Sequence, residues 1–390
     1  MNPGRTDEPL ALYIHWPFCV SKCPYCDFNS HVRDSVDQAA WRQALLADLA
    51  HEAALTAGRP LSSIFFGGGT PSLMPPALVA TLLEEAQRLW GFAPGIEITL
   101  EGNPSSVEAA NYAALASAGI NRASLGLQAL DDATLRFLGR LHDASEGLAA
   151  LEVAQRHFAR VSFDLIYARP GQTPEQWRAE LERALGFGTG HLSLYQLTIE
   201  PGTRFETMVR KGDFAPLDDE TCADLFDLTR EITAAAGLPA YEISNHARRG
   251  EESRHNLAYW RYQDYCGIGP GAHGRRQGVA TVRHRKPENW LAAVDRHSDG
   301  IAEARSLGRN EQAAEAMLMG LRLAEGVDLA ERSARLGVAP RELCDEAKLV
   351  FYIRQGLAWR EGMRIGVTDT GMPLLDALLA ELVPEQLVAG

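Results

Sequence analysis

Residues 12–28 read Leu-Tyr-Ile-His-Trp-Pro-Phe-Cys-Val-Ser-Lys-Cys-Pro-Tyr-Cys-Asp-Phe, a short apolar strand that runs into a loop with three cysteines. Cys19, Cys23 and Cys26 have the spacing C-x3-C-x2-C and are half of the six cysteines in the chain. Three thiolates on one loop favour a metal cluster, because a disulfide framework uses cysteines in pairs spread through a short secreted chain. An iron–sulfur cube normally takes four cysteine ligands, so three leave one iron open to a chelating small molecule. Zinc is the alternative, and its fourth ligand would be His15 or His31.

Length, charge and hydropathy limit what kind of protein this chain can be. A chain of 390 residues can bury a large core, and we expect one domain of barrel size with one or two smaller ones. The net charge of −13 argues against a nucleic-acid partner, which needs a basic surface. No run approaches the roughly 20 apolar residues of a membrane span, and the start of the chain lacks the apolar core of a signal peptide. We therefore predict a cytoplasmic protein with at most peripheral membrane contact. Cys222, Cys266 and Cys344 have no ligand spacing and are expected to be buried or free thiols.

Short β-rich runs alternate with stretches of helical period up to about residue 200, which is typical of βα units and a parallel sheet. Strands are predicted at 12–15, 62–66, 97–100, 122–127, 161–166 and 191–197, and helices at 36–55, 76–90, 106–118, 144–158 and 174–185. We therefore predict an α/β fold, a partial (β/α)6 TIM-type barrel. A full eight-unit barrel is the alternative, and the later chain does not alternate well enough to support it.

Polar and glycine-rich segments follow the predicted strands. In barrels of this type the chemistry lies at the carboxyl ends of the strands. The cysteine loop follows the first strand and the segment 67–72, Gly-Gly-Gly-Thr-Pro-Ser, follows the second, where missing side chains let the backbone approach a ligand. The other candidates at strand ends are Glu101, Gln128, Arg140 and Asp164. We expect these groups to face one mouth of the barrel.

The cysteine motif resembles that of the radical S-adenosylmethionine (SAM) superfamily. Five more segments, Phe-Gly-Gly-Gly-Thr-Pro-Ser, Glu-Gly-Asn-Pro, Ser-Leu-Gly-Leu-Gln, Asp-Leu-Ile-Tyr and Cys-Gly-Ile-Gly-Pro-Gly-Ala-His-Gly, resemble the oxygen-independent coproporphyrinogen III oxidase family. The resemblance implies a [4Fe–4S] cluster on Cys19, Cys23 and Cys26, with SAM on the open iron. It implies SAM contacts at Tyr13, Tyr25, Gly68, Gly69, Thr70, Glu101, Gln128, Arg140, Asp164, Thr198 and His273.

Two departures separate this chain from the oxidase proper. The oxidase has a further cysteine two residues beyond the third, where this chain has Phe28, and a longer extension than the eleven residues that precede the first strand here. The segment 255–260, His-Asn-Leu-Ala-Tyr-Trp, instead resembles the haem-binding signature of the HemW branch, the haem chaperones. The resemblance implies haem binding by His255, Asn256, Tyr259 and Trp260. His246, His273 and His284 are competing ligand candidates.

The last part of the chain has the element order of a winged helix. Helices are predicted at 312–324, 344–354 and 372–382, with a hairpin at 357–360 and 364–367. Residues 301–390 hold 10 basic and 14 acidic side chains, so a docking or cofactor-covering module is preferred to a DNA-binding one. We predict domains at 1–225, 226–300 and 301–390. Arg283, Arg285 and Lys286 would suit haem propionates, and a solvated charged face is the alternative.

The predicted function is haem chaperoning. The protein would hold a SAM-liganded [4Fe–4S] cluster, bind haem and pass it to an acceptor such as a respiratory haemoprotein, with an electron donor serving the cluster. The first alternative is an oxygen-independent coproporphyrinogen III dehydrogenase that acts by radical oxidative decarboxylation. A second is a radical SAM enzyme of unknown substrate in which the hexad is only structural. The sequence leaves open whether the protein is an enzyme.

Overall fold

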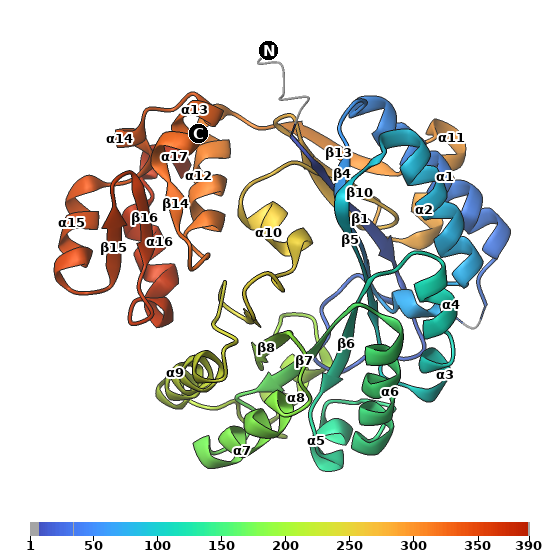
Figure 1. Cartoon of the computed structure of the whole chain (residues 1–390), viewed down its shortest axis with the longest axis horizontal. Coiled ribbons are helices and arrows are strands. Elements are labelled where there is room, and N and C mark those ends of the chain that lie inside the picture. Colours follow the sequence, from blue (N-terminus) through green and yellow to red (C-terminus); the bar gives the residue numbers. More distant parts are fainter. Residues whose placement is uncertain (1–7, 34, 389–390) are drawn as a thin grey trace.

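One sheet of eleven strands organises the chain, which a computed structural model describes at residues 8–33 and 35–388 (Figure 1). Seven neighbouring strands are parallel: β10 (Tyr265–Ile268), β1 (Leu10–Trp16), β4 (Leu61–Gly68), β5 (Phe92–Gly102), β6 (Arg122–Gln128), β7 (Arg160–Tyr167) and β8 (His191–Gln196). Antiparallel strands extend both edges: β11 (His273–Arg276), β12 (Val279–Arg283) and β13 (Ile301–Ser306) beyond β10, and β9 (Asn245–Ala247) beyond β8. No described residues pair β9 with β13, so the sheet stays open.

The predicted α/β fold and its six sequential βα strands are confirmed. Strand β10 was not predicted; it is a seventh parallel strand that pairs with β1 although 248 residues separate their nearest ends. The predicted helix at 106–118 is also wrong in part, because the structure has two short helices, α3 (Ser106–Ala109) and α4 (Tyr112–Ser117).

Helices cover one face of the sheet because alternate strand residues on that face are apolar. Leu12 and Ile14 of β1 and Ile64 and Phe66 of β4 are fully buried there, and each such side chain contributes about 1.5–3 kcal/mol. Figure 1 shows the helices α1, α2, α4 and α6 along this side. The helices of the βα part are α1 (Gln38–Leu55), α2 (Pro76–Trp90), α3, α4, α5 (Asp132–Phe137), α6 (Ala144–His157) and α7 (Pro174–Leu185).

The opposite, inner face of the same strands is polar. Strand register sets Tyr13 beside Phe65, Glu101 beside Ser124, and Asp164 beside Ser193. Helix α10 (Arg254–Trp260) lies over this face and contacts β4, and Figure 1 shows it on the concave side, opposite the covering helices. The inner face of the sheet therefore carries polar and ionisable side chains that could bind a ligand, rather than a packed apolar core.

An ionic cluster joins the extended sheet edge to helix α1. Arg283 of β12 is fully buried, and its guanidinium donates to the Asp48 carboxylate at 2.8 and 2.9 Å and to Glu52 at 2.9 Å. Arg276 of β11 donates to Glu52 at 2.6 Å. The prediction that Arg283 serves haem propionates is therefore wrong, since its charge is already neutralised inside the fold.

The C-terminal elements form a second apolar cluster around a three-stranded sheet in the order β14 (Val327–Asp328), β16 (Arg364–Val367) and β15 (Ala358–Glu361). Its helices are α12 (Arg309–Gly320), α13 (Leu329–Leu336), α14 (Pro340–Leu343), α15 (Glu346–Arg354), α16 (Leu375–Leu382) and α17 (Glu385–Val388). This is the predicted winged-helix-like order of helices and hairpin. The remaining helices are α8 (Arg204–Lys211) and α9 (Asp219–Ala235), which follow β8, and α11 (Pro287–His297), which packs against α1 (Figure 1). Among the described residues, none of the helices has the length and apolarity needed to cross a membrane.

Candidate functional site

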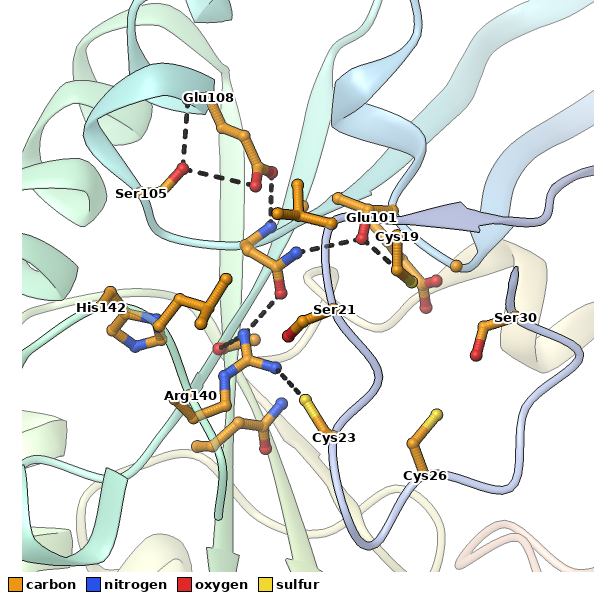
Figure 2. Close-up of a pocket in the computed structure, with 18 of the residues that line it drawn as sticks. Cys19, Ser21, Cys23, Cys26, Ser30, Glu101, Ser105, Glu108, Arg140 and His142 are labelled. Atoms are coloured by element: carbon orange, nitrogen blue, oxygen red, sulfur yellow. Dashed lines mark hydrogen bonds between the residues drawn. The ribbon is translucent and has the colours of Figure 1, made fainter. Parts of the chain in front are cut away.

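The three cysteines of the motif line one cavity at the carboxyl ends of the parallel strands (Figure 2). Cys19 ends the two-residue strand β2 (Phe18–Cys19), which pairs with β3 (His31–Val32), and a turn brings the Cys26 N–H to the Cys23 carbonyl at 3.2 Å. All three thiols are free and partly exposed. The cavity has a volume of about 410 Å³. Three thiols facing one cavity of this size suit a cluster with a small-molecule ligand.

A chain of hydrogen bonds runs from one cysteine to another across the cavity wall. The Arg140 guanidinium donates to Cys23 Sγ at 3.4 Å, a contact drawn in Figure 2, and also donates to the Asn103 side-chain oxygen. The Asn103 amide donates to Thr70 Oγ1 at 3.1 Å, and Thr70 Oγ1 donates to Cys19 Sγ at 3.4 Å. Donors aimed at sulfur stabilise thiolates, so these residues fit a metal-bound cysteine set.

The glycine segment is fitted against the cysteine loop. The Gly69 N–H donates to the Trp16 carbonyl at 2.7 Å, and the Thr70 N–H donates to the Phe18 carbonyl at 2.9 Å. A Cβ on Gly69 would lie 2.7 Å from the backbone carbon of Pro17. Gly68 has φ +115°, and its N–H donates to Glu101 at 3.2 Å. The glycines thus let their own segment cross the cysteine loop in close contact.

Two carboxyl groups meet at the floor of the cavity. Burial and the charge of Asp164 raise the pKa of Glu101 to about 8, and burial raises the pKa of Asp164 to about 6. Gln128, at the end of β6, has a left-handed backbone with φ +70° and a buried Oε1 without a hydrogen-bond partner. A strained residue with a free acceptor at the cavity wall fits a site built to hold a polar, cationic ligand such as SAM.

Most residues expected to contact SAM are brought together here. The cavity is lined by Tyr25, Gly68, Gly69, Thr70, Glu101, Gln128, Arg140 and Asp164. Three others do not line it: Tyr13 faces a second cavity, Thr198 follows β8, and His273 is exposed at the start of β11.

The histidines considered for a zinc site have other partners. His15 Nδ1 lies 3.0 Å from the Tyr13 hydroxyl and His15 Nε2 lies 2.9 Å from the Asn29 carbonyl oxygen. His31 Nε2 lies 3.3 Å from Asn29 Oδ1. Within the described residues, no group of three or more His, Cys, Asp or Glu side chains is placed to hold a single ion. The ligands of a four-iron cube bind different irons and lie farther apart, so the cluster interpretation is favoured over zinc.

The histidine of the hexad is buried on the inner face of the sheet, whereas Asn256, Tyr259 and Trp260 are partly exposed. Ser253 caps the start of α10, and the His255 side chain points to β4, where Nδ1 lies 3.1 Å from Ser63 Oγ and the ring stacks on Phe65 at 5.0 Å. His255 is 4% exposed and, with Asn256 and Tyr259, lines a cavity of about 200 Å³ that excludes Trp260. Burial lowers the pKa of His255 to about 3, which keeps the imidazole neutral.

The second cavity is smaller than the cysteine cavity and opens to solvent beside Tyr195, which is 41% exposed. Pockets for ligands of drug size have volumes of about 300–1,000 Å³, and a porphyrin with its propionates is a large member of that class. The two cavities share the lining residues Glu101, Ser124 and Asp164, so the hexad lies directly behind the cysteine site. Of the competing histidines, His246 is buried with both ring nitrogens unpartnered, and His284 is partly exposed.

Several residues of the site were not predicted from the sequence. Asn103, Glu108 and His142 line the cysteine cavity, and Asn103 joins Arg140 to Thr70. The signal for Asn103 was present, because it belongs to the Glu-Gly-Asn-Pro segment at the end of a strand. His142 had no such signal, since a loop folded back from α5 places it there.

Comparisons with known proteins agree with this geometry. A model of the radical SAM superfamily matches residues 13–184, and a model of the HemN C-terminal domain matches residues 307–374. The protein named heme chaperone HemW of Escherichia coli (strain K12) is 36% identical over 389 residues, which are 97% of this chain and 99% of that protein. The chain belongs to the HemW family of radical SAM proteins. Membership in the superfamily implies a [4Fe–4S] cluster and SAM as cofactors.

A mammalian protein is similar to this chain in sequence, and one solved structure is similar to it in fold. A Mus musculus protein named radical S-adenosyl methionine domain-containing protein 1, mitochondrial, is 37% identical over 395 residues, which are 98% of this chain and 89% of that protein. Coproporphyrinogen III oxidase (HemN) from Escherichia coli has the same fold, with a TM-score of 0.81 at 23% identity, over 96% of this chain and 90% of that one.

Proposed function

We propose that this protein is a haem chaperone, which binds haem and transfers it to an acceptor haemoprotein while carrying a SAM-coordinated [4Fe–4S] cluster. The observation that carries the proposal is the match to heme chaperone HemW over 97% of this chain and 99% of that protein, which leaves no large part of either unaccounted for. The hexad 255–260 and Phe28 support it, because the first resembles the haem-binding signature and the second replaces the oxidase's further cysteine.

Residues of this chain would hold the cluster and SAM as follows. Cys19, Cys23 and Cys26 would bind three irons, and a reduced cluster of this kind supplies the electron that cleaves the sulfonium bond of SAM. Arg140 and Thr70 donate hydrogen bonds to two of the sulfurs. The remaining proposed SAM contacts are Tyr13, Tyr25, Gly68, Gly69, Glu101, Gln128, Asp164, Thr198 and His273.

Partners and organisation follow from the same proposal. Haem transfer requires an acceptor, which would include respiratory haemoproteins. Reduction of the cluster requires an electron donor. We place the protein in the cytoplasm and divide it at residues 225 and 300 into a SAM part, a hexad part and a C-terminal module. A pull-down of haem-loaded protein with candidate apo-haemoproteins tests the proposed haem acceptor.

Anaerobic reconstitution tests the function as a whole. Iron, SAM cleavage and haem binding are measured on one sample, and about four irons per chain and one haem are expected. Cys23→Ala should lose the cluster. Haem transfer to an apo-acceptor without conversion of coproporphyrinogen III supports the chaperone. Formation of protoporphyrinogen from coproporphyrinogen III, SAM and a reductant would select the dehydrogenase instead, whose only structural support is the shared fold.

A further inference from the structure

The helix that carries the hexad ends at a tyrosine with an unusual backbone conformation. Helix α10 is closed by two hydrogen bonds, from the Tyr262 N–H to the Tyr259 carbonyl at 2.9 Å and from the Gln263 N–H to the Ala258 carbonyl at 2.7 Å. This pattern requires a left-handed residue directly after the helix, and Tyr262 has φ +57°. Glycine is the usual residue at such a position, because a Cβ strains the left-handed conformation. A tyrosine here indicates that its side chain makes contacts that outweigh the strain.

The Tyr262 side chain is held by helix α12 and by strand β11. It is 4% exposed and packs in the second apolar cluster, which the C-terminal elements form. Its hydroxyl donates to the Glu315 carboxylate of α12 at 2.6 Å. The Arg275 guanidinium of β11 lies over its ring, 3.5 Å from the ring centroid, and donates to the Gln263 carbonyl at 3.0 Å. Tyr262 therefore belongs to the C-terminal core, although in the sequence it follows closely after the hexad.

The two residues before Tyr262 also contact the C-terminal elements. Arg261 donates to both carboxylate oxygens of Glu325, at 2.7 and 2.8 Å. Gly320 of α12 is close to the backbone of Trp260, since a Cβ on Gly320 would lie 4.0 Å from the Trp260 carbonyl oxygen. Figure 1 shows α10 between α12 and the strands of the sheet, and α10 contacts both α12 and β4. The Arg261 pair is partly exposed and contributes little, so Tyr262 is the main anchor of this helix end.

The same short helix carries the side chains that face the hexad cavity. His255, Asn256 and Tyr259 line this cavity on the inner face of the sheet. Helix α10 has only seven residues, about two turns, so it moves as one body. A displacement of its end at Tyr262 therefore moves Tyr259, whose carbonyl accepts the Tyr262 N–H, and also His255, one turn earlier.

We propose that Tyr262 is a positioning residue of the haem site, which fixes the orientation of α10 through its anchor on α12. The inference rests on the haem function proposed above. Coupling between two sites is reciprocal, so an anchor that favours haem binding is itself stabilised by bound haem. Haem binding is then linked to the order of the segment 309–326, which contains α12 and Glu325, although none of the described residues beyond 300 lines either cavity.

Three variants of the full-length, reconstituted protein separate this role from a purely structural one. Tyr262→Gly removes the anchor and gives the backbone turn the residue that suits it best. Tyr262→Phe keeps the ring under Arg275 and loses only the hydrogen bond to Glu315. Tyr352→Ala, on α15, is the matched control, because it removes another tyrosine side chain that packs against the same apolar cluster. Iron content before haem is added, together with thermal unfolding, confirms that each variant is folded and loaded with its cluster.

Haem affinity and hydrogen–deuterium exchange are measured on each protein. Ferric haem is titrated anaerobically, and bound haem is counted as the pyridine complex after gel filtration so that cluster absorption does not interfere. In the unchanged protein, haem should slow exchange in residues 309–326. Tyr262→Gly should weaken haem binding about fivefold or more, the lower end of the usual coupling between sites, and should abolish this protection. Tyr262→Phe should keep most of both effects, and Tyr352→Ala should lower thermal stability without changing haem affinity.

Three outcomes would contradict the proposal. If haem leaves exchange in residues 309–326 of the unchanged protein unaltered, or if Tyr262→Gly binds haem as tightly as the unchanged protein, the inference is overturned and the haem function stands. Equal losses of haem affinity in Tyr262→Gly and Tyr352→Ala would show that Tyr262 acts only through the stability of the C-terminal core, which also overturns the inference. If the unchanged protein binds no haem, the proposed function fails and the inference fails with it.

Discussion

Arg140 offers the sharpest test of the hydrogen-bond chain at the cysteines. Its guanidinium donates to Cys23 Sγ at 3.4 Å, and the reduced cluster, which carries one more negative charge, gains more from this cation than the oxidised cluster does. A hydrogen bond to a charged group is worth about 1.5–3 kcal/mol. Only the part of this energy that differs between the two oxidation states shifts the potential. Since about 1.4 kcal/mol corresponds to 59 mV for one electron, Arg140→Gln should lower the midpoint potential by tens of millivolts and by no more than about 130 mV.

The assay is an anaerobic redox titration followed by electron paramagnetic resonance, without SAM because Arg140 is also a proposed SAM contact. Arg140→Lys keeps the charge and should shift the potential less. Arg136→Gln, which removes an exposed arginine of α5, is the control, and screening should keep its shift below about 20 mV. An Arg140→Gln potential equal to that of the unchanged protein, with iron content intact, would refute the reasoning.

Three further outcomes are expected. Asp48→Ala should cost about 3–5 kcal/mol in urea unfolding, because it leaves two buried arginines, Arg276 and Arg283, to share the single carboxylate of Glu52. A cost under about 1 kcal/mol would contradict the ion-pair account. The pKa of Glu101 rises on folding to about 8 from its ordinary 4.5, so this carboxyl lowers the free energy of unfolding as pH increases through that interval. Glu101→Gln should therefore flatten the decline of the free energy of unfolding between about pH 5 and 8.5. The same slope in the variant and the unchanged protein would speak against this account. Gly69→Ala should disturb the loop crossing at Pro17 and reduce iron content, and full iron incorporation would show that the crossing can relax.

Local sequence features predicted the sheet and the cysteine site well. The strands β1 and β4 to β8 follow from short β-rich runs, and the cavity residues from their positions at strand ends. The structure of residues 245–306 was harder to predict from the sequence. β10 is only four residues long and joins the sheet through pairing with β1, so its strand character depends on a partner more than 200 residues away. Arg283 looked like an exposed cation because its partners, Asp48 and Glu52, lie on a distant helix.

The sequence by itself determined the cluster ligands and the order of the βα units, because cysteine spacing and hydrophobic alternation are local properties of the chain. Only the tertiary structure decided that His255 packs against β4, that Asn103 links Arg140 to Thr70, and that Phe28 and Leu141 line the same cavity. Those facts depend on which segments the folded sheet brings together, and burial is set by packing among distant segments rather than by any short stretch of residues.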